Sequence, residues 1–316
     1  MKILKVKCLA PTRLDKYLMD QFPVLGPGKL NKALRENKIK LNGRKQPLST
    51  RVVAGDEIKL FILDDQLDDT ARQSGPAWKS ARCPAEVVYD CPQLLVVNKP
   101  AGLTVDGPDD DTLINRALLY LYKDGQYKEN DPYTPALCHR LDTGTSGLVL
   151  IAKTPQAEEI LTEAIRKREV KKTYLCVTFG RPTPPDAELE GWLLKDADAG
   201  IVKIVEDKRP GAKNVKTGYE TIAVSGRLAL LKVDLITGRT HQIRAHMASI
   251  GCPILGDSKY GNNAANRELK LKYQALCAWE LTLPRFTDPD MASLSGKSFR
   301  APKPWYYSQV VDGTLK

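Results

Sequence analysis

The chain has 316 residues, of which 42% are hydrophobic and 27% are charged, so it is long enough to bury a core in one large domain or in a large and a small one. No run of about 18 apolar residues occurs, and the first residues alternate lysine with apolar residues, so we expect neither a membrane-spanning segment nor a signal peptide. The net charge of +10 is uneven, because residues 1–63 contain 14 basic and 5 acidic residues whereas the other 253 contain 34 and 33. Such concentrated positive charge suits a polyanion, either nucleic acid or an acidic membrane surface, and a contribution to solubility alone is the alternative.

Residues 1–63 are predicted to form a small unit of two helices and several strands. Thr12 has the N-cap position of a capping box, and the helix that follows it is expected to end at the Pro and Gly residues of 23–28. A second helix is predicted from about residue 29 to residue 36, with apolar residues on one face and basic residues elsewhere. Strand patterns follow at 39–41 and 58–62.

Residues 64–84 are predicted to be a linker, because aspartates are followed there by a polar stretch with almost no apolar periodicity. Residues 85–316 are predicted to form one globular domain. Its apolar patterns predict strands at 86–89, 94–97, 148–151, 174–177, 219–222 and 230–236, and helices at 113–122 and after the pair Thr154 and Pro155. Strands outnumber helices and several connections are too short for a parallel crossover. We therefore expect an α+β fold with a mixed, largely antiparallel central sheet and flanking helices.

The seven cysteines argue against a zinc ribbon and against a disulfide framework. Their number is odd, their spacings are wide, and no C-x-x-C arrangement occurs. We therefore expect reduced thiols in a cytoplasmic protein.

All three histidines lie in two short segments rich in Gly, Thr and Arg, residues 139–147 (HRLDTGTSG) and 237–246 (TGRTHQIRAH). Loops of this composition beside a strand carry functional groups more often than core segments do. His241 and His246 have a spacing that occurs in zinc sites, but no further ligands accompany them, so we expect no metal. His246 is expected to be structural.

The first 63 residues resemble an S4 RNA-binding domain. The resemblance rests on residues 13–18 (RLDKYL), the basic second helix, residues 39–43 (IKLNG) and residues 55–58 (GDEI), in that order. It implies that the basic helix lies against structured RNA, with RNA contacts from Lys29, Lys32, Arg35 and Arg44. Binding of this kind is dominated by phosphate contacts and is sensitive to salt.

From about residue 85 onward the chain resembles the RluA-type pseudouridine synthases. The resemblance rests on the match of residues 139–147 to the family signature and on four further segments in the family's order, 98–102 (NKPAG), 172–174 (KTY), 237–246 and 256–261 (GDSKYG). It implies the pseudouridine synthase fold and conversion of uridine to pseudouridine with no metal or other cofactor. Cys277, where many members carry His, and the polar segment 196–217 depart from the family pattern and leave the target RNA open.

The resemblance marks Asp142 as the indispensable group. Without it, an aspartate in such a turn-rich context more often forms an Asx-turn or a surface ion pair. In the reaction the N1–C1′ bond of uridine breaks, the uracil rotates and C5 bonds to C1′, which builds positive character at C1′. A carboxylate there stabilises or traps that charge, or removes a sugar proton, and the sequence does not choose among these roles.

Two further residues are implied to be catalytic by the resemblance. Tyr174 is implied to pack on the target base and to help remove the C5 proton. Because a phenol has a pKa of about 10, we favour the packing role over the base role, and a half-buried strand aromatic is the alternative. Arg244 is expected in the first turn of a helix with Thr240 as N-cap, where the resemblance implies pairing with Asp142 and contact with the phosphate backbone. A solvated surface arginine is its alternative.

The remaining residues of the two segments are expected to contact RNA or to shape the loop. Arg140, Arg239 and His241 are expected to contact RNA, and His139 and Thr145 to orient the signature loop. The target nucleotide must also be flipped out of stacked RNA, and contacts made by the basic N-terminal residues would offset part of that cost.

We therefore predict a cytoplasmic, monomeric enzyme that isomerises uridine in large-subunit ribosomal RNA, with transfer RNA as the second candidate substrate. Two rivals belong to other classes, a non-catalytic RNA-binding protein with an inert former site and a nucleoside hydrolase acting on small molecules. The intact set of Asp142, Tyr174 and Arg244 argues against the first rival. The basic N-terminal region argues against the second.

Overall fold

A computed structural model describes residues 2–8, 11–22, 25–62, 76–196 and 200–315. The side chains of Pro27, Gly28 and Lys32 also lie outside the described part. The chain divides into two compact units, Met1–Pro76 and Ala77–Lys316, and each is described by itself. No helix within the described ranges is long and apolar enough to cross a membrane.

The first unit packs two helices against a small sheet. The sheet has the strand order β1-β5-β3 with antiparallel pairing, and a second pair joins β2 to β4. The bounds are β1 Lys2–Lys5, β2 Thr12–Arg13, β3 Ile39–Leu41, β4 Arg51–Val52, β5 Glu57–Leu60, α1 Leu14–Gln21 and α2 Pro27–Arg35. Leu14, Leu18 and Leu30 from the helices pack with Ile58 and Leu60 from β5, and all five are fully buried. The amphipathic patterns of the sequence thus produce one small core.

Both helices of the first unit differ at their starts from the prediction. The capping box at Thr12 is wrong, because the residue before α1 is Arg13, which makes no side-chain cap bond. Asp15 instead accepts hydrogen bonds from the Arg13 guanidinium and from the Lys16 N–H. The second helix begins at Pro27, two residues before the predicted start, because proline is compatible with the first helical turn.

The predicted linker 64–84 is shorter than expected where the structure describes it. Residues 63–75 lie outside the described residues, but 77–84 belong to the second unit. A 3₁₀ helix, η3 (Ala77–Ser80), buries Trp78, whose ring centroid lies 4.8 Å from that of Tyr122 and 5.8 Å from that of Tyr127. Trp78 therefore anchors this polar stretch to the core of the second unit.

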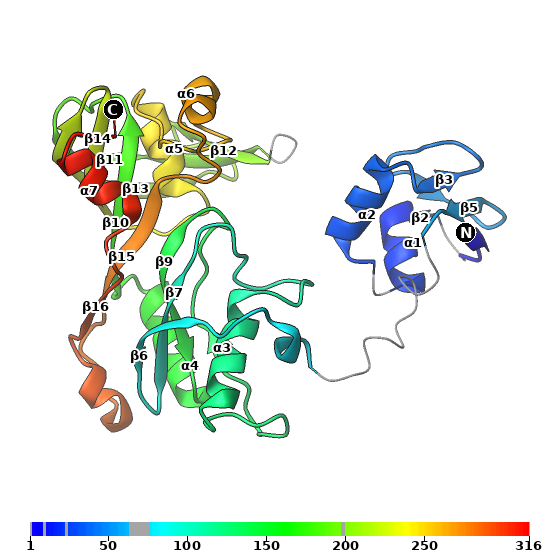
Figure 1. Ribbon diagram of the computed structural model, residues 1–316, viewed down its shortest axis with the longest axis horizontal. Coiled ribbons are helices and arrows are strands. Elements are labelled where there is room, and N and C mark those ends of the chain that lie inside the picture. The colour runs from blue at the N-terminus through cyan, green and yellow to red at the C-terminus, as the bar shows by residue number, and fades with distance from the viewer. Residues whose placement is uncertain (1, 9–10, 23–24, 63–75, 197–199, 316) are drawn as a thin grey trace. The chain divides into compact units, whose positions relative to one another are not determined.

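The described residues of the second unit form an 11-stranded, mostly antiparallel sheet with helices on both faces (Figure 1). Its main path is β12-β11-β13-β14-β10-β15-β9-β7-β6, while β16 pairs with β15 and β8 pairs with β9. The strands are β6 Glu86–Asp90, β7 Leu94–Lys99, β8 Ala136–Leu137, β9 Ser146–Ala152, β10 Lys171–Phe179, β11 Asp186–Asp196, β12 Ile201–Val205, β13 Lys213–Ser225, β14 Leu228–Leu235, β15 Leu276–Thr282 and β16 Ser298–Arg300. The helices are α3 Leu113–Lys123, α4 Pro155–Arg166, α5 Gln242–Ser249, α6 Asn263–Glu268, η4 Pro289–Leu294 and α7 Trp305–Val311. The predicted α+β class with a largely antiparallel sheet is confirmed.

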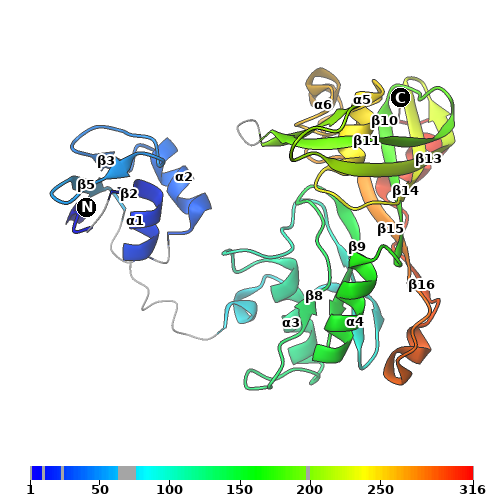
Figure 2. The ribbon, with the colours of Figure 1, turned by 180° about the vertical axis from the view of Figure 1, so that it is seen from behind.

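Successive residues of the central strands enter two different cores. Leu95 and Val97 of β7 belong to a buried cluster that also contains residues of α3 and α5, whereas Leu94 and Val96 belong to a second cluster that contains residues of α4 and α7. This follows from the period of two in a strand, which sends alternate side chains to opposite faces. Figures 1 and 2 show α3 and α4 beside the β7 and β9 end of the sheet, and α5 and α7 beside the β13 and β14 end. Strands buried on both faces explain the continuous apolar runs of the sequence.

The two halves of the sheet meet where β9 runs parallel to β15. Only two residue pairs form this contact, Ser146 with Cys277 and Gly147 with Ala278. Gly147 has a φ of +110°, and a Cβ added to it would lie 2.2 Å from the Ala278 carbonyl oxygen. Glycine at this position therefore permits the close approach that ends the signature loop and begins β9.

Gly147→Ala is expected to destabilise the protein by about 3 kcal/mol or more, because it combines an unfavourable φ with a backbone clash. Gly125→Ala is the matched control, since Gly125 also has a positive φ of +76° but nothing lies within 4 Å of an added Cβ. The control is expected to lose about 1 kcal/mol, the cost of the backbone conformation alone. Urea unfolding measures both, and equal losses would show that the contact with β15 is not the constraint.

Candidate active site

A pocket of about 1000 Å³ is lined by several loops and by residues of the central strands. Its walls come from residues 139–145, 238–244 and 272–274, together with Lys172 and Tyr174 of β10. Both histidine-containing segments of the sequence therefore contribute to one cavity, although about 100 residues separate them.

Asp142 lies in the turn between β8 and β9, with its side chain 26% exposed at the pocket wall. Its carbonyl oxygen accepts the N–H of Thr145 at 3.0 Å, which closes the turn. The buried hydroxyl of Thr145 accepts a hydrogen bond from Nε2 of Gln274 at 3.1 Å. A Cβ on Gly144 would overlap the same glutamine amide. The turn is therefore packed against the segment before β15, and the carboxylate is left open to the pocket.

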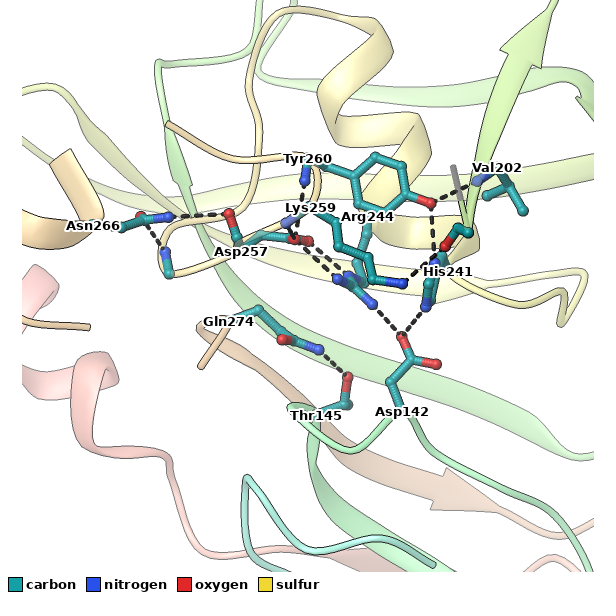
Figure 3. A network of polar contacts seen from close by, with 12 residues as sticks. Asp142, Thr145, Val202, His241, Arg244, Asp257, Lys259, Tyr260, Asn266 and Gln274 are labelled. Atoms are coloured by element: carbon teal, nitrogen blue, oxygen red, sulfur yellow. Dashed lines mark hydrogen bonds and ion pairs between the residues drawn. The ribbon is translucent and has the colours of Figure 1, made fainter. Parts of the chain in front are cut away.

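Arg244 is 5% exposed and directs all three of its side-chain nitrogens to two carboxylates (Figure 3). Nη1 donates to Oδ2 of Asp142 at 2.8 Å, while Nε and Nη2 donate to Asp257 at 2.7 and 2.9 Å. Asp257 is fully buried and also accepts the backbone N–H groups of Lys259 and Tyr260. The two-point bond to Asp257 fixes the guanidinium plane and so fixes the donor that Asp142 meets.

The pKa shifts of this pair follow from the same contacts. Burial opposes both charges, yet the hydrogen bonds and charge of Arg244 hold the pKa of Asp257 below its ordinary value. For Arg244, burial acts to lower the pKa, but the two carboxylates outweigh it and raise the pKa. Both groups are therefore ionised at neutral pH.

His241 approaches the same oxygen of Asp142 as Arg244 does, with Nε2 3.6 Å from Oδ2. Its Nδ1 lies 3.0 Å from the hydroxyl of Tyr260, which accepts the N–H of Val202 at 2.8 Å (Figure 3). The Tyr260 hydroxyl thus joins the backbone of β12 to the imidazole, whose neutral form can either accept from this hydroxyl or donate to it. Burial lowers the pKa of His241, which favours this neutral form.

The helix that carries Arg244 begins differently from the prediction. The residue before α5 is His241, not Thr240, and it has a left-handed φ of 55° with no side-chain cap bond. The Gln242 amide instead ties the helix to the loop before it, since its Oε1 accepts the N–H of Arg239 and the hydroxyl of Thr237. Arg244 is nevertheless in the first turn, as expected.

Tyr174 projects from β10 into the pocket wall and is 7% exposed. Burial and then the charge of Asp142 raise the pKa of its phenol. The phenol is therefore protonated at neutral pH, and the ring offers an apolar face beside the carboxylate.

Lys99 and Asp257 are the residues whose roles the sequence reasoning missed. Lys99 is fully buried, and its ammonium donates to the carbonyl oxygens of Pro100, Leu103 and Thr143 at 3.0, 2.7 and 3.0 Å. Burial lowers its pKa to about 8. The bond to Thr143 ties the residue after Asp142 to the loop that follows β7. The matched segments 98–102 and 256–261 contained both residues, but nothing in the sequence identified their partners.

His139 binds the backbone of the sheet. Its Nε2 accepts the N–H of Leu150 at 3.2 Å, next to the point where the Cys138 N–H donates to the Leu150 carbonyl. The imidazole thus continues the short β8–β9 ladder by one hydrogen bond. Burial, with a smaller effect from the charge of Lys172, lowers the pKa of His139 to about 3, so the ring stays neutral and serves as an acceptor.

The other predicted site residues are distributed over both units. Arg140 and Arg239 are exposed at the pocket, and Arg140 pairs with Asp106 at 2.9 Å. His246 is buried with Nδ1 2.8 Å from the Thr217 hydroxyl and does not line the pocket. Lys29, Arg35 and Arg44 are exposed in the first unit, while the side chain of Lys32 lies outside the described part. Among the described residues no group of three or more His, Cys, Asp or Glu is arranged to hold a metal ion.

Comparison with known proteins identifies the class. The family described as RNA pseudouridylate synthase matches residues 93–249. The fold is shared with the human protein named RNA Pseudouridylate Synthase Domain Containing 4, with a TM-score of 0.58 and 24% identity over 72% of this chain and 92% of that one. The architecture is therefore that of a pseudouridine synthase.

Curated relatives give the family. Ribosomal large subunit pseudouridine synthase C of Rickettsia bellii (strain RML369-C) is 36% identical over 271 residues, which cover 83% of this chain and 86% of the relative. Ribosomal large subunit pseudouridine synthase D of Yersinia pestis is 32% identical over 255 residues, covering 79% and 73%. The chain belongs to the RluA-type RNA pseudouridine synthases and is an isomerase.

Asp257→Asn is expected to destabilise the protein by about 3 kcal/mol at pH 7, because Arg244 loses one of the two charges that compensate its burial. The folded-state pKa of Asp257 is depressed, so its stabilising contribution is complete above the unfolded value of about 4 and is lost as the pH falls through the folded value. The difference in unfolding free energy between wild type and variant should therefore be constant from about pH 5 to pH 7 and narrow below about pH 4.

Urea unfolding across this pH range measures the difference. Asp142→Asn is the comparison variant, because Asp142 is 26% exposed and solvent replaces part of what it loses. If the difference in unfolding free energy between wild type and Asp257→Asn became larger on acidification, the depressed pKa assigned to Asp257 would be contradicted.

Proposed function

We propose that the protein converts uridine to pseudouridine in large-subunit ribosomal RNA, with Asp142 as the catalytic carboxylate. The single observation that supports this most is a partly open carboxylate in a large pocket, bonded to an arginine that a buried aspartate fixes in place. The names of the curated relatives, which are ribosomal large subunit pseudouridine synthases, support the choice of RNA.

The proposed chemistry requires a negative oxygen beside the ribose of a flipped nucleotide. As the N1–C1′ bond breaks, C1′ becomes electron-poor, and Asp142 either adds to C1′ or removes the proton at C2′. Both routes need the carboxylate to keep one geometry while the uracil detaches and turns. Arg244 and His241 approach the same oxygen, Oδ2, which leaves Oδ1 as the atom available to the sugar.

Tyr174 is proposed to pack against the uracil. Its raised pKa makes the phenol a weak candidate for removing the C5 proton at neutral pH, whereas the buried ring beside Asp142 supports a stacking role. Arg140 and Arg239 are proposed to contact phosphates at the pocket entrance, since both are exposed there. His139 and Thr145 are proposed to orient the loop through their bonds to Leu150 and Gln274.

The first unit is proposed to be an S4-like domain that anchors RNA. Its support is the set of exposed basic residues on and after α2, namely Lys29, Arg35 and Arg44. The residues of both helices also contribute to one small core. We also propose that one chain suffices for activity, since the pocket is built from one unit. All seven cysteines are free, which is compatible with the cytoplasm.

Asp142→Asn is expected to bind RNA like wild type and to form pseudouridine at least about 1000-fold more slowly, because the amide carries no charge for C1′ or the C2′ proton. The measurement is a single-turnover reaction on ribosomal RNA followed by mass analysis or primer extension. Asp106→Asn is the matched control, an acidic residue of the same pocket that pairs with Arg140 and is expected to keep activity. Equal product from Asp142→Asn and wild type would remove Asp142 from its role.

The RNA target is tested by mapping pseudouridines in total RNA with and without this protein. Loss confined to large-subunit ribosomal RNA supports the proposal, whereas loss confined to transfer RNA would replace the substrate. A protein that binds RNA but leaves every pseudouridine in place would be a binding module, and release of free uracil would indicate a hydrolase.

Replacing Lys29 and Arg35 together by Gln is expected to reduce the slope of log affinity against log salt by about 2, because each phosphate contact contributes about 1. Affinity for structured RNA at low salt should fall, while the single-turnover rate at saturating RNA should stay unchanged. The control pair is Lys123→Gln with Lys128→Gln, two exposed lysines of the second unit. An unchanged slope for the first pair would show that α2 is not the anchor.

A further inference from the structure

Lys172 is a half-buried cation of the pocket for which the described part of the chain provides no anion. It lies two residues before Tyr174 on β10, so both side chains project from the same face of the strand, and both line the pocket with Asp142. Within the described part of the chain its ammonium makes no hydrogen bond and no ion pair.

The other cations of the pocket wall differ from Lys172. Arg244 is bonded to two carboxylates, Arg140 pairs with Asp106, and Nζ of Lys259 donates to the Gly200 carbonyl at 2.8 Å. Arg239 and Lys272 are exposed to water. Lys172 alone combines burial with the lack of a partner among the cations of this wall that the structure describes.

Within the described part of the chain, the surroundings of Lys172 supply no anion that compensates its charge. Burial lowers its pKa, and no neighbouring acid within the described ranges acts in the opposite direction. Asp142 is committed to Arg244, and His139 is neutral and bonded to Leu150. A charged ammonium in such a place is stabilised when a ligand supplies the anion.

Gly238 leaves the approach to this ammonium open. A Cβ built on Gly238 would have Nζ of Lys172 as its sole described neighbour within 4 Å, at 4.0 Å. Any side chain at 238 would therefore extend toward the amine from the loop that also holds His241. The lack of a side chain on this glycine leaves space for a ligand group between that loop and β10.

We propose that Lys172 forms a phosphate subsite, in which its ammonium binds a non-bridging oxygen of one of the two phosphodiesters flanking the flipped uridine. The proposal rests on RNA being the substrate of the pocket. A nucleotide cannot enter without its flanking phosphates, and these are the anions that RNA brings. A charge-assisted bond to phosphate would compensate the burial of Lys172 and would fix the ribose relative to Asp142.

The test is a double-mutant cycle between Lys172→Met and a neutral RNA linkage. The probe is a synthetic oligoribonucleotide containing a uridine that the wild-type protein converts, made with a methylphosphonate in place of the phosphodiester either 5′ or 3′ of that uridine. Dissociation constants are measured in the full-length Asp142→Asn background, so that no turnover occurs. Product formation by wild type on the unmodified RNA reports separately on the proposed function.

At one of the two linkages the neutral substitution is expected to weaken binding about tenfold or more when Lys172 is present. In the Lys172→Met variant the same linkage is expected to have no further effect, because the ammonium that would meet the phosphate is gone. Lys172→Met is also expected to reduce the salt slope by about 1. Lys171→Met, which replaces the exposed neighbour on the opposite face of β10, is the control and should keep the wild-type response to both linkages.

The thermal stability of the free protein separates this role from a structural one. Lys172→Met removes an uncompensated charge and no bond, so its Tm should equal or exceed that of wild type, and Lys172→Arg should retain part of the RNA affinity. A lower Tm for Lys172→Met would show a structural lysine and overturn the proposal. Additive effects at both linkages would overturn it as well.

Discussion

The geometry of the pocket depends on one buried guanidinium shared between two carboxylates. Arg244 is held in a fixed plane by Asp257, which is fully buried, and its remaining nitrogen meets Asp142 at 2.8 Å. Asp257 compensates the buried charge of the arginine, and the arginine in turn orients the carboxylate of Asp142. Arg244 therefore keeps a buried counter-charge when Asp142 is removed. When Asp257 is removed, only the partly exposed Asp142 compensates the buried guanidinium.

Around this pair the protein assembles loops from distant parts of the chain by close backbone contact. Lys99 bonds to the Thr143 carbonyl, Gly147 contacts Ala278, and Gln274 bonds to Thr145. Each contact joins the signature turn to a different neighbour, the loop after β7, strand β15 and the segment before it. The turn is thereby fixed on several sides while its carboxylate remains open to the pocket.

The sequence predicted the strands and the fold class for physical reasons, and its two histidine-containing segments line one pocket. Strands buried on both faces give apolar runs, and the role of Asp142 is a prediction that the signature 139–147 supplies. The partners of Lys99 and Asp257 were not predictable in this way, since backbone carbonyls and a buried arginine leave no local pattern. The predicted starts of α1 and α5 were wrong because backbone carbonyls of Leu48 and Thr50 accept the first N–H groups of α1, and because His241 and not Thr240 precedes α5.

The bond from Val202 to Tyr260 connects the edge of the sheet to the pocket. Val202 lies in the edge strand β12, and its N–H donates to the Tyr260 hydroxyl that lies 3.0 Å from Nδ1 of His241. A shift of one residue in the pairing of this hairpin would present a different backbone group to the tyrosine. The position of the edge strand β12 is thereby linked, through one backbone N–H and the Tyr260 hydroxyl, to the histidine beside Asp142.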